Sequence, residues 1–205
     1  MQAQDGKVLL EGNIGHNAFF GEFGAISVEV EHSLEKYFAI KGGVQYNTIG
    51  RTAIEARPAF FHDMKWGQFS AEVLLHYVRQ SSINNYVAGA GLGISGKWAY
   101  CKLGYYYRTF SFDNWQINEI FNIYYEGGIN FLPMCENWDL QLVFTNSEMF
   151  ELERHYQPSY KLQGWYYPIK KLGLTLGLSY KPSGMFNMSA GYYQLYTNLG
   201  ICYKW

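Results

Sequence analysis

Charged residues recur at alternate positions inside short apolar stretches of this sequence. Glu29 and Glu31 alternate with valines, and Lys102 is followed by apolar and aromatic residues at every second position. Successive side chains of a β-strand point to opposite faces, so this spacing places the charges on one face and the apolar groups on the other. Charged groups in a confined interior require partners or water. The pattern predicts an enclosed interior lined by charged side chains.

Six charged residues are expected at a similar depth in that interior, counted from the predicted turns. These residues form a predicted charge belt: Glu31, Lys41, Arg57, Glu72, Lys102 and Glu126. Glu31 with Lys41, and Arg57 with Glu72, fall on adjacent strands and are expected to pair across them. One interpretation is a plug, in which paired charges and tyrosines fill the interior. The other is a constriction that selects small polar or charged solutes. The balance of charge favours the plug, whereas the glycines of 86–94 and 172–180 leave room for a channel.

No catalytic constellation is predicted. Hydrolases need a nucleophile, a base and an orienting group within hydrogen-bond reach. His32 and Ser33 are sequence neighbours on a predicted strand, so their side chains diverge. Glu151, Glu153 and His155 alternate in a charged loop, but nothing there fixes a metal geometry. We therefore expect a solvated loop, no metal site, no cofactor and no enzymatic activity.

Composition excludes several classes of protein. The net charge of −1 provides no basic surface for nucleic acid. The mean hydropathy of −0.20 and the lack of long apolar runs argue against membrane-spanning helices. Three cysteines, Cys101, Cys135 and Cys202, have no metal-binding spacing, and their odd number leaves a free thiol. The informative excess is aromatic, at 19% of residues, together with 22 glycines, which suits strands that lie in a bilayer.

The elements that would position these charges are twelve strands separated by Gly- and Asn-containing turns. The predicted strands are 8–15, 26–34, 38–46, 54–61, 69–77, 86–94, 99–109, 117–131, 138–144, 160–166, 172–180 and a last strand that ends at 205. Pro58 weakens the fourth strand because proline removes a ladder donor. The last strand is expected to begin near 186, with a change of phase near Ala190.

Aromatic residues fall near both ends of these strands. One group lies beside the shorter connections and comprises Trp66, Trp98, Trp138, Tyr167 and Trp205. The other lies beside the longer, more polar connections and comprises Tyr46, Tyr77, Tyr86, Tyr107, Trp115 and Tyr180. Two such bands are typical of membrane-spanning barrels, in which aromatic girdles flank an apolar belt. The shorter connections and both termini are then expected on the periplasmic side.

The final stretch alternates and ends on aromatic residues. Leu195, Leu199 and Ile201 share one face with Tyr203 and Trp205, and polar or small residues occupy the other. This stretch resembles the closing strand of bacterial outer-membrane β-barrels. The resemblance implies that Tyr203 and Trp205 are an assembly signal for the barrel-assembly machinery. It also implies a location in the bacterial outer membrane, with lipid as a partner.

The sequence thus predicts an all-β protein, a transmembrane up-and-down antiparallel β-barrel of about twelve strands, with ten as the alternative. Residues 1–6 are expected to be a tail and 7–205 a single barrel domain, in a mature form from which a signal peptide has been removed.

The expected function is that of an accessory or structural barrel among other outer-membrane proteins, or of a narrow pore. The alternative is a small-solute channel with a charged constriction. A lipid-modifying or proteolytic barrel enzyme ranks last, because no nucleophile–base pair is evident.

Overall fold

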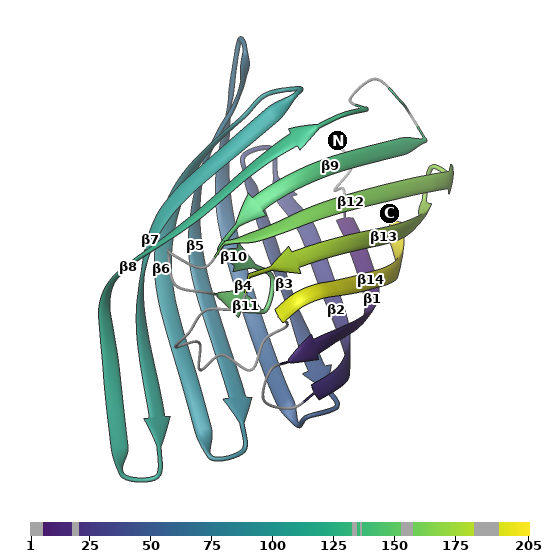
Figure 1. Cartoon of the computed structure of the whole chain (residues 1–205). Helices are drawn as coiled ribbons and strands as arrows, with labels where there is room; N and C mark the ends of the chain where they lie inside the picture. Colours follow the sequence, from purple (N-terminus) through teal and green to yellow (C-terminus); the bar gives the residue numbers. More distant parts are fainter. Residues whose placement is uncertain (1–5, 18–20, 133–134, 136, 153–157, 183–192) are drawn as a thin grey trace.

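The chain forms a closed barrel of twelve antiparallel strands (Figure 1). The computed structural model describes residues 6–17, 21–132, 135, 137–152, 158–182 and 193–205. The first eight strands are β1 (Gly6–Asn17), β2 (Gly21–Glu35), β3 (Phe38–Asn47), β4 (Arg51–Met64), β5 (Gly67–Gln80), β6 (Ile83–Ser95), β7 (Ala99–Phe112) and β8 (Trp115–Asn130). The remaining wall strands are β9 (Trp138–Thr145), β12 (Ser159–Ile169), β13 (Leu172–Lys181) and β14 (Tyr193–Lys204). The prediction of a twelve-stranded all-β barrel is confirmed.

Each wall strand pairs with its neighbours in chain order, and β14 closes the barrel against β1. Gly6 and Trp205 exchange backbone hydrogen bonds of 3.3 and 3.0 Å, so the two described chain ends meet at one end of the barrel. We call this the terminal end, and the other the opposite end. No helix long and apolar enough to cross a bilayer occurs in the described part of the chain.

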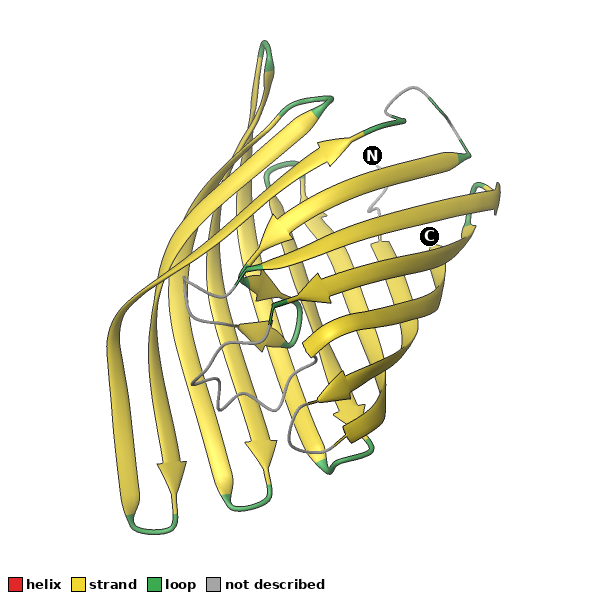
Figure 2. Ribbon diagram, viewed as in Figure 1, coloured by secondary structure: helices red, strands yellow, loops and turns green. Residues whose placement is uncertain are grey.

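Two short strands do not belong to the wall. β10 (Ser147–Glu148) and β11 (Glu151–Leu152) lie between β9 and β12 in sequence and form their own two-stranded sheet. Figure 2 shows this sheet inside the ring of wall strands. The described residues 147–152 of the connection from β9 to β12 therefore lie inside the barrel.

The side chains alternate between the two faces as the sequence predicts. Every position of β13 changes between exposed and buried, with leucines and Tyr180 outside and Gly, Thr, Ser and Lys181 inside. In β14 the described side chains do the same: Leu195, Leu199 and Ile201 face outward and Asn198 faces inward. A wall of this kind has an apolar outside and a polar inside, which is the arrangement a bilayer-spanning barrel needs.

Exposed aromatic side chains lie near both ends of the wall. Trp66, Trp98 and Trp138 are exposed in or beside the connections of the terminal end, and Tyr86 and Trp115 are exposed toward the opposite end. Their function as membrane girdles stays a prediction.

The last residues of β14 also face outward. Tyr203 and Trp205 are exposed, and their rings stack with centroids 6.5 Å apart. The assembly role of these two residues stays a prediction. The expected start of this strand near 186 lies outside the described residues.

Two irregularities of the wall bear on the lumen. Pro58 lies inside β4, and the β4–β5 register has no pairs between Ala56 and Ala59, because proline has no N–H to donate to the ladder. The β8–β9 ladder contains only five pairs, from Glu126 to Asn130, so most of β8 extends beyond β9 (Figure 1). The Asn146 side chain ends this ladder: it accepts from Tyr125 N and donates to Ile123 O.

Candidate functional site

Residues 147–152, which we call the lumen segment, lie inside the barrel and pack against one side of it. Phe150 is 1% exposed and contacts Ala53 and Val78 on β4 and β5. Leu152 is 7% exposed and belongs to a second apolar cluster. The wall residues of that cluster are Leu74, Val87, Tyr106 and Tyr124. The β4–β8 side of the lumen is therefore closed by apolar packing at this level.

Three arginines of the wall donate hydrogen bonds to backbone carbonyls of the lumen segment. Arg51 Nη2 donates to Phe150 O at 2.5 Å, and Arg108 Nη2 donates to Leu152 O. Arg57 Nη2 donates to Ser147 Oγ at 3.0 Å and to Ser147 O at 3.4 Å. All three arginines are buried. Hydrogen bonds from a charged donor are about twice as strong as neutral ones, so these contacts hold the segment along its length.

Glu55 joins the wall to the lumen segment. Its carboxylate, 2% exposed, accepts from Arg57 Nε and from Phe150 N at 3.0 Å, and lies 2.9 Å from His76 Nδ1. A buried carboxylate is retained only when its oxygens are well satisfied. Glu55 meets that condition by binding two wall side chains and the segment's own backbone.

Phe150 adopts an unusual backbone conformation at the turn between β10 and β11. Its φ of 67° lies in the left-handed region, which costs a bulky residue about 1–3 kcal/mol. That conformation accompanies a buried ring, an N–H bound to Glu55 and a carbonyl bound to Arg51. The surrounding contacts thus hold the turn in a shape that an isolated loop would seldom adopt.

The other side of the lumen segment faces a polar crevice. A cavity of about 50 Å³ separates it from the wall formed by β1–β3, β12 and β14. On the wall side, the crevice is lined by Glu11, Asn13, Ser27, Glu29, Gln45, Lys161 and Tyr196. Glu148, Met149 and Phe150 line it on the segment side. Tyr196 Oη on β14 donates to Glu148 Oε2 across this crevice. The segment therefore has an apolar packed side and a polar side that this hydrogen bond ties to the wall.

The structure brings three residues of the predicted charge belt into contact. Lys102 Nζ lies 3.3 Å from Glu72 Oε2 and 4.0 Å from Glu126 Oε1. Tyr124 Oη donates to Glu72 Oε1 at 3.2 Å. These side chains join β5, β7 and β8 across the inner face.

Of the other three belt residues, Lys41 and Arg57 have different partners from those expected. Lys41 pairs with Glu29 at 3.0 Å, although its register partner is Glu31, which is exposed. Arg57 pairs with Glu55, two residues away on the same face of β4, and not with Glu72. The spacing of two between Glu55 and Arg57 was a visible signal for this pair.

The cysteines and the alternating loop, where the sequence predicts no metal site, lie apart from these contacts or outside the described residues. Cys101, Cys135 and Cys202 are free thiols, two exposed and one buried. Glu153 and His155 of the alternating loop lie outside the described residues. Across the described ranges, no three His, Cys, Asp or Glu residues are arranged to hold a metal ion.

Tyr124 lies flat across two glycines of the inner wall, and this contact gives a direct test of lumen packing. A Cβ at Gly104 or at Gly91 would overlap the Tyr124 ring or hydroxyl. We expect Gly104→Ala to lower the unfolding free energy by about 1–3 kcal/mol, the usual cost of overpacking. The measurement is denaturant unfolding in lipid vesicles.

The matched control is Gly12→Ala, because a Cβ at Gly12 meets its nearest neighbour at an ordinary 3.9 Å. In a Tyr124→Ala background the same Gly104→Ala change should cost almost nothing, which a double-mutant cycle measures. Equal losses with and without the Tyr124 ring would contradict the packing described here.

Comparison with solved structures places the fold among outer-membrane barrels. A structure described as the KdgM porin matches with a TM-score of 0.62 at 12% identity, covering 96% of this chain and 98% of that one. A NanC porin structure matches with a TM-score of 0.59 at 12% identity, covering 98% and 99%. The Acinetobacter baumannii outer membrane protein Omp33 matches with a TM-score of 0.54 at 7% identity, covering 100% of both chains.

The sequence itself matches no protein-family model, and no curated protein sequence is similar to it. The likeness to solved structures thus concerns the fold. The chain has the fold of a small outer-membrane β-barrel protein, a fold that it shares with structures described as porins.

Proposed function

We propose that this protein is a narrow outer-membrane channel for small polar solutes, whose lumen is restricted by residues 147–152. The observation that carries the proposal is the two-sided environment of this segment. It is bound to the β4–β8 wall by apolar packing and buried arginines, and it faces the remaining wall across a polar crevice. The two porins with the same fold support a channel over other roles.

The size of the barrel supports a lumen that the segment blocks only in part. An eight-stranded barrel is about filled by its own inward side chains, whereas barrels of about 16–18 strands leave an open aqueous channel. Twelve strands lie between these limits, so the lumen has room for a chain segment and for a path beside it. On this side the segment meets the wall where Tyr196 donates to Glu148 and where the Phe150 ring lies beside Gly43. The rest of the crevice is lined by Glu, Asn, Ser, Gln and Lys side chains, which suit water and small polar solutes.

The charge of the crevice sets the expected selectivity. Glu11, Glu29 and Glu148 line it together with one lysine, Lys161. Lys41 neutralises Glu29 through its ion pair, which leaves a small excess of negative charge. We therefore propose a weak preference for cations, which a reversal-potential measurement under a salt gradient would detect.

Thiol accessibility tests where the path runs. In a background with the three native cysteines replaced by alanine, Lys161→Cys should react with a water-soluble methanethiosulfonate reagent, and the reaction should reduce the current in a planar bilayer. Ala53→Cys should not react, because Ala53 lies beneath Phe150 and is fully buried. Leu162→Cys faces outward and is the matched control on the same strand.

Two outcomes would contradict the channel. One is a folded barrel that passes no current in a planar bilayer and co-purifies with other outer-membrane proteins, as the accessory role expected from sequence requires. The other is a current that is blocked through Ala53→Cys but not through Lys161→Cys, which would place the path on the packed side.

A further inference from the structure

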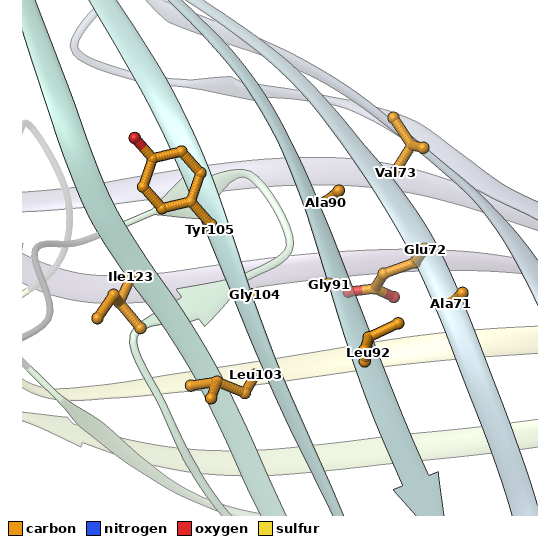
Figure 3. A pocket seen from close by; sticks show the side chains of 10 residues that line it. All are labelled: Ala71, Glu72, Val73, Ala90, Gly91, Leu92, Leu103, Gly104, Tyr105 and Ile123. Carbon is orange, nitrogen blue, oxygen red and sulfur yellow. The ribbon is translucent and has the colours of Figure 1, made fainter.

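The outer wall carries an apolar groove that the channel proposal does not use. It lies over β5, β6, β7 and β8 and has a volume of about 580 Å³ (Figure 3). Its lining is Ala71, Glu72, Val73, Ala90, Gly91, Leu92, Leu103, Gly104, Tyr105 and Ile123. Glu72 is buried and its carboxylate is bound to Tyr124 in the lumen. The outward side chains of the groove are therefore aliphatic, apart from Tyr105.

The register shows how the groove arises. Ala90 on β6 stands in one row between Val73 on β5 and Tyr105 on β7, with Ile123 beyond. The next outward residue of β6 toward the opposite end, Ala88, is also small. Larger side chains on β5 and β7 therefore flank the two alanines, Ala88 and Ala90, on β6.

The wall beneath the groove is thin. Gly91 and Gly104 have no side chain on the inner face, and the Tyr124 ring covers both of them from the lumen. Toward the terminal end, the paired Leu92 and Leu103 close the trough with larger side chains. The result is a narrow apolar depression over β6 and its neighbours.

The depression lies within the apolar band of the wall. It falls between Tyr86, exposed on β6 near the opposite end, and Trp98, exposed in the β6–β7 connection at the terminal end. The outward side chains around it, Leu75, Val73 and Ile123, are exposed and aliphatic. If the barrel spans a membrane, this position faces the hydrocarbon and not the headgroups.

We propose that this groove is a binding site for one acyl chain of a membrane phospholipid. Neighbouring strands are about 4.8 Å apart, so the ridges on β5 and β7 stand about 10 Å apart with a one-strand floor between them. A single hydrocarbon chain fits that floor lengthwise. An α-helix of a partner, about 10–12 Å across with its side chains, would rest on the ridges. The proposal rests on the membrane location but not on conduction.

Native mass spectrometry of the folded barrel tests the site. The detergent-purified protein is titrated with dipalmitoyl phosphatidylethanolamine, and the number of lipids retained per barrel is counted. We expect one lipid that resists removal, followed by further lipids that dissociate readily. Ala90→Phe fills the groove from its floor and should abolish the retained lipid. Ala56→Phe, on the outward-facing side of β4 and outside the groove, is the matched control and should keep it.

Heat-modifiable migration on a detergent gel confirms that each variant is folded before lipids are counted. Equal retention by the wild-type protein and by folded Ala90→Phe would overturn the proposal, as would a graded series of lipids with no distinct first one. A co-purifying polypeptide that is lost in Ala90→Phe but not in Ala56→Phe would overturn it in favour of a protein partner. The channel proposal is measured by current, so its failure leaves these outcomes unchanged.

Discussion

A barrel in which residues 147–157 are replaced by Gly-Ser-Gly is expected to conduct several-fold more current than the wild-type protein. Thr145 and Ser159 are paired across β9 and β12, so a short hairpin connection can join these strands without the lumen segment. The replacement keeps Asn146, which ends the β8–β9 ladder. It removes Phe150 and Leu152 from the lumen and leaves water in their place.

Single-channel recording in a planar bilayer measures this effect. The control is Ser81→Gly, which changes the β5–β6 turn at the same end of the barrel, where Ser81 has a φ of 52°, and leaves the lumen untouched. The control should keep the wild-type conductance. A correctly folded deletion variant with unchanged conductance would show that residues 147–152 do not restrict the path, and the proposed function would lose its main support.

The faces of the wall could be predicted from sequence because they depend only on strand periodicity. A residue's parity within a strand decides whether it meets the outside or the lumen. Glu55, Glu72 and Lys102 were therefore placed on the inner face correctly. Turn residues and alternation also indicated twelve strands, because each strand carries its own local pattern.

The lumen segment could not be predicted in the same way. Its contacts join residues far apart in the chain, such as Phe150 and Glu55, 95 positions apart. The local periodicity of a sequence carries no information about such contacts. The connection between β9 and β12 was expected to be solvated because it contains Glu and His residues. The available signal was Phe150 and Leu152, two apolar residues in a charged connection. An apolar residue in a loop indicates burial, but it does not indicate against which surface.

The two expected ion pairs fail for different reasons. The β4–β5 register is the same on both sides of Pro58, and it places Glu72 opposite Ala59 and not opposite Arg57. Arg57 instead reaches its same-face neighbour Glu55. Glu31 does stand opposite Lys41, but it is exposed near the terminal end, where water competes for its charge. Lys41 pairs with the more buried Glu29.

Glu55→Gln is expected to destabilise the barrel by about 3 kcal/mol, because removing one partner of a buried ion pair leaves the other charge uncompensated. Arg57 and His76 both lose a carboxylate partner. An amide also brings N–H groups toward donors, so one of the three contacts, including that from Phe150 N, must break. The unfolding midpoint in denaturant, followed by Trp fluorescence in lipid vesicles, measures the loss.

Glu22→Gln is the matched control for that substitution, since the Glu22 side chain is 81% exposed beside His16; its stability should stay within about 0.5 kcal/mol of wild type. The Glu55 change also predicts release of the lumen segment, which a merely destabilised wall does not. Ala53→Cys, unreactive beneath Phe150, should become reactive toward a methanethiosulfonate once Glu55→Gln is added. Continued protection of that thiol in a destabilised barrel would show that the arginine contacts alone hold the segment, and that Glu55 supports only the wall.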